Sequence, residues 1–403
     1  MGGALSGVRV IDLTQMLAGP YCTMMLADQG AEVIKIEPVG GDPTRLFGPF
    51  REDDRDRHFG GYFQSTNRNK LSLALDLKQP QGREIFLSLI READIVVENF
   101  RAGVMDRLGI GYEVLAKENP RLVYAAIRGF GDPRTGQSPH VDRPAFDVVA
   151  QAMGGAMAIT GPDAHTPLKI GPGIGDIFPA ALAAFGILAA YHHAVRTGQG
   201  QFVDVSMYDG ILSLCERAVY QYSYTGSSPA PEGNQHPILC PFGVFAALDG
   251  QVTIGCPRDT FWVELVTIMG RPELAADPRF RTNNDRLAHR AETVEIVESW
   301  TRGRTKAEIA EALGVRVPFG PVNTAADIYA DPHMKARQML VEVEHPGSAS
   351  PVTVASTPIR MTATPGGVVR RAPLTGEHTA AILKGMGLAD DAVERLKAAR
   401  IVG

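Results

Sequence analysis

The sequence has few cysteines and lacks the signature motifs of several enzyme classes. Its 403 residues include four cysteines and no CxxC pair, so we expect reduced thiols that fill core positions and no disulfide framework. HExxH, GxSxG and a lysine-bearing phosphate loop are also absent, which argues against zinc proteases, α/β-hydrolases and P-loop enzymes. The ten histidines are dispersed, and His192 and His193 face different sides of a helix, so we expect no metal site.

Long apolar runs and blocks of one charge are missing as well. No uninterrupted apolar run approaches the roughly 18 residues of a membrane helix, and residues 1–10 lack the basic and apolar regions of a secretory signal. The formal net charge of -5 is scattered along the chain, without the basic block that binds a phosphate backbone. We therefore expect a cytoplasmic protein with neither nucleic acid nor membrane among its partners.

The first half of the chain alternates short β-branched runs with helical patterns, as parallel strands joined by crossover helices do. The clearest helix is 80–93, in which Ile85, Phe86, Leu89 and Ile90 recur with helical spacing. The predicted strands are 8–13, 33–37, 71–77, 94–100, 122–130 and 202–206. These patterns predict an α/β domain with a helix-covered sheet.

A domain boundary is expected at residues 225–241, a segment rich in proline, glycine and serine. Beyond it, Asp249 and Gly250 between two strand-like runs predict a hairpin. Those runs are 244–248 and 251–255, the helical patterns that follow are 261–269, 284–300 and 306–313, and later strand-like runs are 340–344 and 352–361. We therefore predict a large domain over 1–224, a small α+β domain over 225–334, and a C-terminal segment, 335–403, with two helices that returns to the large domain.

Three glycines, Gly171, Gly173 and Gly175, lead into a helix predicted over 177–195. That helix is apolar almost all round and should lie deep in the protein. The glycines allow close approach of a ligand and leave free N–H groups at a positive helix end. Asp176 stands where a dinucleotide fingerprint needs its third glycine, which argues against nicotinamide binding. From local sequence alone, Asp176 is either a helix N-cap or a positioned nucleophile.

An ordered set of motifs adds a resemblance that extends over most of the chain. The motifs are LSGVRVIDL at 5–13, LAGP at 17–20, GAEVIKIEP at 30–38 with GD at 41–42, NRNK at 67–70, ENFR at 98–101, RPAFD at 143–147, GD at 175–176, TGQGQ at 197–201, and DPH at 331–333 with AR at 336–337. Together they resemble the class III CoA-transferases, the family of formyl-CoA and carnitine CoA-transferases that also includes α-methylacyl-CoA racemase. The resemblance implies a Rossmann-like large domain and a homodimer of interlocked, ring-shaped subunits.

The resemblance also implies a mechanism. Asp176 would attack the donor thioester, form a mixed anhydride and then an aspartyl-CoA thioester, with coenzyme A as co-substrate and no permanently bound cofactor. Asp147 matches a family position that carries a second carboxylate, which either orients substrate and shapes the pKa of Asp176 or has a helix-start or salt-bridge role. The family's CoA-binding positions correspond here to Gln15, Ala18, Lys35, Lys70, Asn99, Phe100 and Arg107. Basic side chains among them suit phosphates, and Phe100 suits the adenine or the pantetheine arm.

The racemase branch requires a histidine 30 residues before the aspartate, and this chain has Phe146 there. Formyl-CoA transferases carry a polar aromatic at that position and a glycine-rich lid where this chain has residues 233–237, and these departures argue against oxalate and formate. We therefore favour transfer from succinyl-CoA to a small dicarboxylate such as mesaconate, citramalate, itaconate or glutarate. Arg51, Arg55, Arg57 and Arg68 form either a clamp for the second carboxylate or a charged surface loop. A racemase and a non-catalytic CoA-binding protein remain as alternatives.

Overall fold

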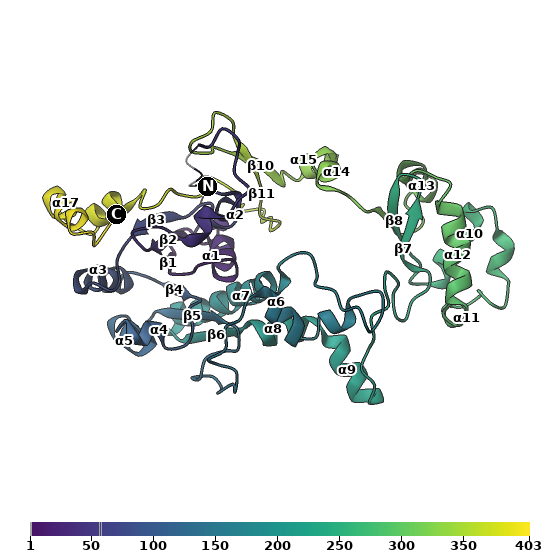
Figure 1. The fold of residues 1–403 in the computed structure, drawn as a ribbon, viewed down its shortest axis with the longest axis horizontal. Coiled ribbons are helices and arrows are strands. Elements are labelled where there is room, and N and C mark those ends of the chain that lie inside the picture. Colours follow the sequence, from purple (N-terminus) through teal and green to yellow (C-terminus); the bar gives the residue numbers. More distant parts are fainter. Residues whose placement is uncertain (1, 56, 58) are drawn as a thin grey trace. The chain divides into compact units, whose positions relative to one another are not determined.

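The computed structural model describes residues 2–55, 57 and 59–403 and divides the chain into two compact units (Figure 1). The first unit comprises Met1–Ala156, Lys169–Tyr220 and His333–Gly403. The second comprises Met157–Leu168 and Gln221–Pro332. The segment Met157–Leu168, which lies within the predicted large domain, clusters with the second unit.

A six-stranded parallel sheet forms the centre of the first unit. Its strands are β1 (Arg9–Asp12), β2 (Glu32–Glu37), β3 (Leu71–Ala74), β4 (Ile95–Glu98), β5 (Val123–Arg128) and β6 (Phe202–Ser206). They lie in the order β3-β2-β1-β4-β5-β6, with every neighbouring pair parallel. This is the Rossmann strand order, so the predicted fold class is confirmed. The order reverses between β1 and β4, and ligands of such sheets bind at the carboxyl ends of the two strands that flank this point.

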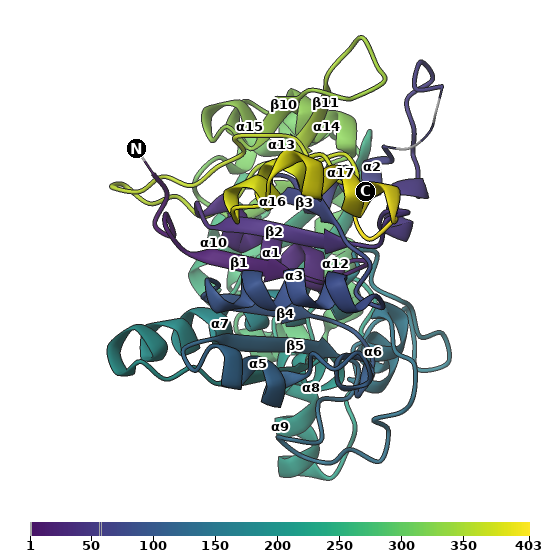
Figure 2. The same cartoon turned by 90° about the vertical axis from the view of Figure 1, so that its left-hand side faces the viewer.

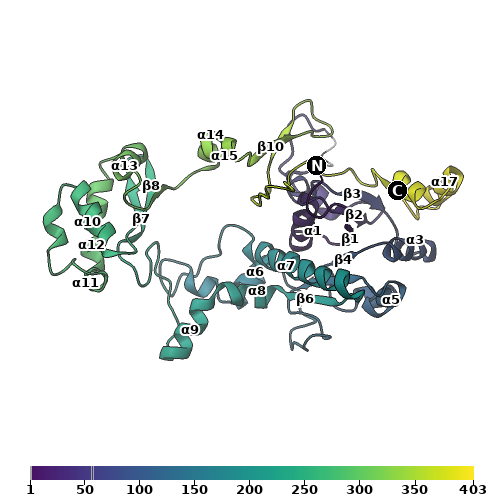
Figure 3. The ribbon, with the colours of Figure 1, turned by 180° about the vertical axis from the view of Figure 1, so that it is seen from behind.

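Helices cover both faces of this sheet (Figure 2). One face is covered by α3 (Pro80–Arg91), α4 (Val104–Arg107), α5 (Tyr112–Glu118), α16 (Thr379–Gly385) and α17 (Asp390–Ala398), which share one apolar core with the strands. The other face is covered by α1 (Ala18–Asp28) and α7 (Ile174–Thr197), and Figure 3 shows α6 (Asp147–Met153) and α8 (Met207–Leu214) beside α7. The remaining helices of this unit include α2 (Gly61–Asn67) and a 3₁₀ turn at Pro43–Leu46. Helix α15 (Pro332–Ala336) begins at the last residue of the second unit and continues into the first.

The C-terminal segment returns to the sheet edge formed by β3. The N–H of Asp76 donates to the carbonyl of Ile401 at 2.8 Å, and the N–H of Gly403 donates to the carbonyl of Ala74 at 3.2 Å. A two-stranded antiparallel ribbon precedes the last helices and consists of β10 (Leu340–Val343) and β11 (Val352–Ala355). The second of these strands is shorter than the predicted run 352–361.

Helix α7 differs from its prediction in two ways. It begins at Ile174, so Asp176 lies inside the first turn; the N-cap is Gly173, and the N-cap alternative for Asp176 is wrong. The helix is also not buried all round. Its alanine face packs on α1 and the sheet, whereas Phe185 is 75% exposed and Val195 is 54% exposed. By length and composition alone α7 could cross a membrane, a property that core helices share.

The second unit is a small α+β module. Its antiparallel strands are β7 (Phe242–Ala247), β8 (Gly250–Gly255) and β9 (Phe319–Pro321). Its helices include α9 (Glu216–Thr225, shared with the first unit), α10 (Asp259–Ile268), α11 (Asn283–Ala288), α12 (Arg290–Thr301), α13 (Lys306–Leu313) and α14 (Ala325–Ala330). Two 3₁₀ turns lie at Met157–Ile159 and Pro272–Ala275. The predicted hairpin is present, but Ala247 pairs with Gly250, so its turn is Leu248–Asp249. The predicted helix 284–300 is two helices, because the backbone leaves the helical region at His289.

Candidate active site

Asp176 lies in the first turn of α7 and lines a cavity in the first unit. Its side chain is half-buried and makes no hydrogen bond with the residues that the structure describes. Burial, with a smaller contribution from the negative charge of Asp147, raises the pKa of Asp176 to about 7. A carboxylate without stabilising donors is a stronger nucleophile than one that is already hydrogen-bonded, so Asp176 has the properties of a reactive group.

Asp147 is the first residue of α6 and lies next to the start of α7. Its Oδ1 accepts a hydrogen bond from the N–H of Gly175 at 2.8 Å. Gln151, one helical turn later, donates to Oδ1 at 2.9 Å and to Oδ2 at 3.0 Å. Lys169 Nζ lies 3.8 Å from Oδ2. The structure therefore brings both predicted carboxylates to one place and holds only Asp147 with hydrogen bonds.

The glycine segment leaves fewer free N–H groups than expected. The N–H of Gly175 donates to Asp147, and those of Asp176 and Ile177 donate to the carbonyl of Gly173 at 3.1 and 2.9 Å. Gly175 is needed for close packing, because a Cβ there would lie 2.4 Å from the Asp147 carbonyl oxygen. The glycines therefore allow α6 to pack closely against α7, and they also leave Asp176 accessible.

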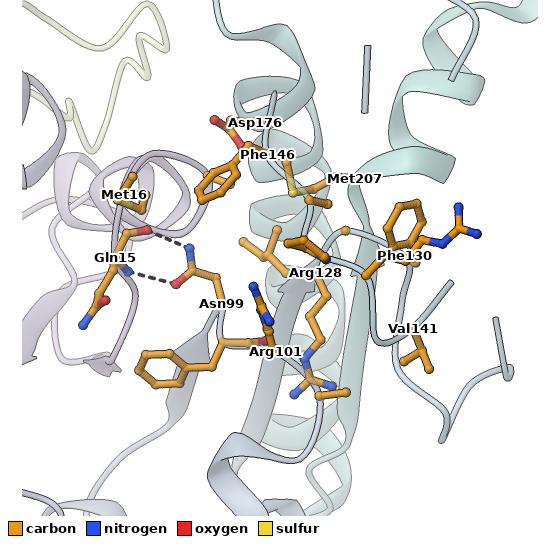
Figure 4. Close-up of a pocket in the computed structure, with 18 residues that line it drawn as sticks. Gln15, Met16, Asn99, Arg101, Arg128, Phe130, Val141, Phe146, Asp176 and Met207 are labelled. Carbon is orange, nitrogen blue, oxygen red and sulfur yellow. Dashed lines mark hydrogen bonds between the residues drawn. The ribbon is translucent and has the colours of Figure 1, made fainter. Parts of the chain in front are cut away.

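The cavity that Asp176 borders measures about 200 Å³. Figure 4 shows Phe146 beside Asp176, with Gln15 and Asn99 on one wall and Phe130 and Val141 on another. The residues that line it are Gln15, Met16, Ala18, Asn99, Phe100, Arg101, Ala102, Ile127, Arg128, Gly129, Phe130, Val141, Arg143, Pro144, Ala145, Phe146, Asp176 and Met207. Four of the seven predicted CoA-binding residues, Gln15, Ala18, Asn99 and Phe100, are among them.

Gln15 and Asn99 connect the two strands at the reversal point of the sheet. The side chain of Asn99, just after β4, accepts from the Gln15 N–H at 2.9 Å and donates to the Gln15 carbonyl at 2.7 Å (Figure 4). The loop after β1 is therefore held against β4 by a reciprocal amide pair. Met16 follows with a φ of 67°, a left-handed conformation that its side chain gave no reason to predict.

A second cavity of about 550 Å³ shares Gln15 and Phe100 with the first. It lies against the carboxyl ends of β1, β2 and β3 and is mostly apolar. Its lining residues are Leu13, Gln15, Ile36, Glu37, Pro38, Val39, Leu75, Asp76, Leu77, Lys78, Phe100, Val104, Leu108 and Arg400. The exposed Arg107 lines neither cavity, although its helix neighbours Val104 and Leu108 line the second.

The structure corrects the expected phosphate-binding role of Lys35 and Lys70. Both lysines are buried in an ion-pair network, with Lys35 Nζ 2.9 Å from Asp42 and Lys70 Nζ 3.0 Å from Asp12. Burial lowers the pKa of Lys70 to about 8. Lys35 also donates to the Thr14 carbonyl at 2.7 Å, so these ammonium groups support the loop that carries Gln15.

The arginine clamp expected at Arg51, Arg55, Arg57 and Arg68 is also not supported. None of the four lines the cavity at Asp176; Arg68 is buried in an ion pair with Asp28 at 2.6 Å, and Arg51 pairs with Asp53 at 3.1 Å. Charge-pattern reasoning could not separate buried from free arginines.

Other arginines, which the sequence did not single out, do line the cavity. Arg128 is held by Glu98 and Asp132. Arg101 and Arg143 are exposed and make no ion pair with the described residues. These two are the cationic groups of the cavity that remain available to a ligand.

Tyr62 and Gln151 are further neighbours of the site that were missed. Burial and the charge of Asp176 raise the pKa of Tyr62, on α2, to about 12. No sequence signal indicated this tyrosine. Gln151 stands four residues after Asp147, a helical spacing that would have placed the two side chains together had α6 been predicted.

Comparisons with known proteins show which family and fold this chain is similar to. The model of CoA-transferase family III matches residues 5–379. The succinyl-CoA:mesaconate CoA-transferase of Haloarcula hispanica is 50% identical over 397 residues, covering 97% of this chain and 99% of the relative. The succinyl-CoA–D-citramalate CoA-transferase of Chloroflexus aurantiacus is 39% identical and covers 99% and 98%. A CAIB/BAIF family protein from Brucella suis has a TM-score of 0.85 at 36% identity, with 96% and 100% covered.

The family model matches almost the whole chain, the relatives are 39 to 50% identical, and the fold is shared with a solved structure of a CAIB/BAIF family protein. The expected resemblance is confirmed, and this chain is a CoA-transferase that belongs to CoA-transferase family III.

Proposed function

We propose that this enzyme moves CoA from succinyl-CoA to a small dicarboxylate, with mesaconate as the first candidate, through an acyl group carried on Asp176. The observation that carries the proposal is the half-buried carboxylate of Asp176, which lines a cavity at the strand ends and makes no hydrogen bond to any residue within 2–55, 57 and 59–403. The proposed substrates are taken from the two relatives, which are named as transferases of CoA between succinyl-CoA and a C5 dicarboxylate, mesaconate or D-citramalate.

The reaction divides into four acyl exchanges, and in each of them one acyl bond forms while another breaks. An Asp176 oxygen attacks the succinyl thioester, the C–S bond breaks, and CoA leaves as a thiolate. The thiolate attacks the aspartyl carbonyl of the anhydride, succinate leaves, and an aspartyl-CoA thioester remains. The acceptor carboxylate then displaces CoA, and the returning thiolate attacks the acceptor carbonyl to give the new thioester and free Asp176. Each intermediate keeps an activated acyl bond, so water must be excluded.

The surroundings of Asp176 suit that requirement. Phe146 lies beside the carboxylate, and Met207 and Ile127 line the same cavity (Figure 4). Apolar walls reduce hydrolysis of an anhydride and strengthen electrostatic interactions within the cavity. Asp147, fixed by the Gly175 N–H, is proposed to keep the pKa of Asp176 near neutrality rather than to react itself.

CoA is proposed to extend through the two cavities that meet at Gln15 and Phe100. Its thiol end would lie in the smaller cavity, towards Asp176, and its adenine end in the larger apolar one, where Phe100 offers a stacking face. Arg101 and Arg143 would meet a phosphate or the second carboxylate of the acyl group. Ala18 and Asn99 shape the wall, whereas Lys35 and Lys70 have no direct role in this proposal.

A racemase is disfavoured by the same geometry. Phe146 stands where an imidazole would be required, and His140 does not line the cavity, because its ring packs against Phe130 at 5.4 Å between centroids. A CoA-binding protein without turnover would not need, in the wall of the cavity, a carboxylate that the described part of the chain leaves without a hydrogen bond. The transferase is therefore the function that the site supports best.

We also propose a cytoplasmic homodimer with interlocked subunits. The apolar face of α7 supports an assembly, since Phe185 and Val195 are exposed in the single chain. Sedimentation of the purified enzyme at low micromolar concentration would show a dimer; a monomer at that concentration would contradict this part of the proposal.

The substrates are tested by offering succinyl-CoA with mesaconate, citramalate, itaconate, glutarate and oxalate, and identifying each new thioester by mass spectrometry. Mesaconyl-CoA or another C5 dicarboxyl-CoA should dominate, and the Asp176→Asn variant should form none. Formation of oxalyl-CoA alone, or α-proton exchange of a branched acyl-CoA without an acceptor acid, would overturn the proposal.

A further inference from the structure

Gln151 is completely buried, and its side-chain amide makes hydrogen bonds to Asp147 and to the main chain of Ile170 and Pro172, in the segment that leads to Asp176. Its Nε2 lies 2.9 and 3.0 Å from the two oxygens of Asp147, with the carbonyls of Pro172 and Ile170 at 3.4 and 3.5 Å. Its Oε1 accepts the N–H of Ile170 at 2.9 Å. Every group around Nε2 is an acceptor and the group at Oε1 is a donor, so the amide has one satisfied orientation.

These contacts join two segments that are separate in the chain. One is the start of α6, which carries Asp147, and the other is the glycine segment that leads to Asp176. Asp147 closes the connection through the Gly175 N–H at 2.8 Å. Displacing the amide would leave the Ile170 N–H without a partner among the described residues, and would leave Asp147 with the Gly175 N–H as its remaining hydrogen bond.

We propose that Gln151 is a positioning residue for the transferase, which holds Asp147 and the Ile170 main chain together so that Asp176 meets the thioester in a fixed orientation. This inference rests on the proposed nucleophilic role of Asp176. Gln151 does not touch the substrate; it acts through the two segments that it joins. A displacement of about 1 Å at a reacting group costs on the order of 100-fold in rate, which is the scale expected here.

The first test is Gln151→Met in the full-length enzyme, which keeps the length of the side chain and removes its donors and acceptor. The kcat per folded enzyme should fall by about 10- to 100-fold while the KM for succinyl-CoA changes by less than about threefold. Asn119→Leu is the control, because Asn119 is also an amide that bonds main chain, with Ile90 and Ala93 carbonyls at 2.9 and 2.7 Å, but on the opposite sheet face. It should lower the melting temperature and leave kcat per folded enzyme unchanged.

The second test reverses the hydrogen bond between the two side chains. In Asp147→Asn with Gln151→Glu, the asparagine amide donates to the glutamate, the glutamate still accepts the Ile170 N–H, and one carboxylate is retained. The double variant should be at least about tenfold more active than Gln151→Glu alone, in which two carboxylates face each other. An additive loss in the double variant, or wild-type kcat in Gln151→Met, would overturn the positioning role.

The proposed nucleophile is tested separately in the same preparations. Acylation of Asp176 by succinyl-CoA, with release of CoA, should be slowed in Gln151→Met by the same factor as kcat. If wild-type Asp176 is acylated and Gln151→Met reacts at the wild-type rate, only the positioning role fails. If wild-type Asp176 is never acylated, the proposed function fails instead.

Discussion

The Oδ1 atom of Asp147 accepts the N–H of Gly175 at 2.8 Å, and this bond, together with those from Gln151, holds a negative charge beside the nucleophile candidate Asp176. These bonds fix the position of that charge near Asp176. Because like charges disfavour further ionisation, the charge adds to burial in raising the pKa of Asp176 to about 7. A carboxylate with a pKa in this range is a better nucleophile than an ordinary aspartate and is still largely ionised slightly above neutral pH.

Removing this charge should move the pH profile. Asparagine at position 147 can still accept the Gly175 N–H through its carbonyl oxygen, but it no longer repels the Asp176 charge. We expect the acid limb of kcat/KM, near pH 7 in the wild type, to shift to lower pH in Asp147→Asn. Measuring kcat/KM for succinyl-CoA from pH 5 to 9 checks this; an unchanged limb would show that Asp147 does not influence the essential ionisation.

The raised pKa also predicts a stability effect. The unfolded chain has Asp176 ionised above about pH 4, whereas the folded chain retains the proton up to about pH 7, so this group stabilises the fold at low pH and the stabilisation is lost as pH rises through 7. At pH 8 the wild type must bury a charge that Asp176→Asn does not have. We expect Asp176→Asn to be more stable than the wild type by about 1 to 3 kcal/mol at pH 8 and by less at pH 5. Denaturant titrations at the two pH values measure the difference, and equal stability at pH 8 would contradict it.

The fold was largely predictable, because the sheet is built from β-branched runs whose period and length identify strands. The strand Phe202–Ser206 and the helix Lys306–Leu313 occur with the predicted bounds. The two errors in α7 have a common cause, since composition does not say which residue begins a helix or which apolar side chains the chain itself covers. Lys35 and Lys70 were misplaced because charge alone does not reveal burial; their carboxylate partners are Asp42, in the loop after β2, and Asp12, at the end of β1.

Because α6 packs closely on α7, substitution of Gly175 should have a larger effect than substitution of Gly171. A Cβ on Gly175 would lie 2.4 Å from the Asp147 carbonyl, whereas a Cβ on Gly171 has no neighbour within 4 Å. Gly175→Ala should therefore separate the two helices and lower kcat by about 100-fold, with Gly171→Ala close to wild type. Steady-state kinetics of the two variants decides the matter, and equal activity of both would show that the packing is not required.

Asn99 should matter for CoA affinity rather than for chemistry. Asn99→Ala leaves the N–H and the carbonyl of Gln15 without partners, at a cost of about 1 to 3 kcal/mol. The loop after β1 should become mobile, and the dissociation constant for CoA should rise by about tenfold or more. Calorimetric titration with CoA gives this value, and an unchanged affinity would exclude the β1 loop from the CoA site.

Covalent trapping on Asp176 tests the central claim most directly. The enzyme is incubated with succinyl-CoA, treated with hydroxylamine and digested, and the peptide that contains Asp176 is examined by mass spectrometry. We predict a hydroxamate at Asp176 in the wild type, none in Asp176→Asn, and no transferase activity in that variant. A hydroxamate on a different carboxylate, or wild-type velocity in Asp176→Asn, would contradict the account.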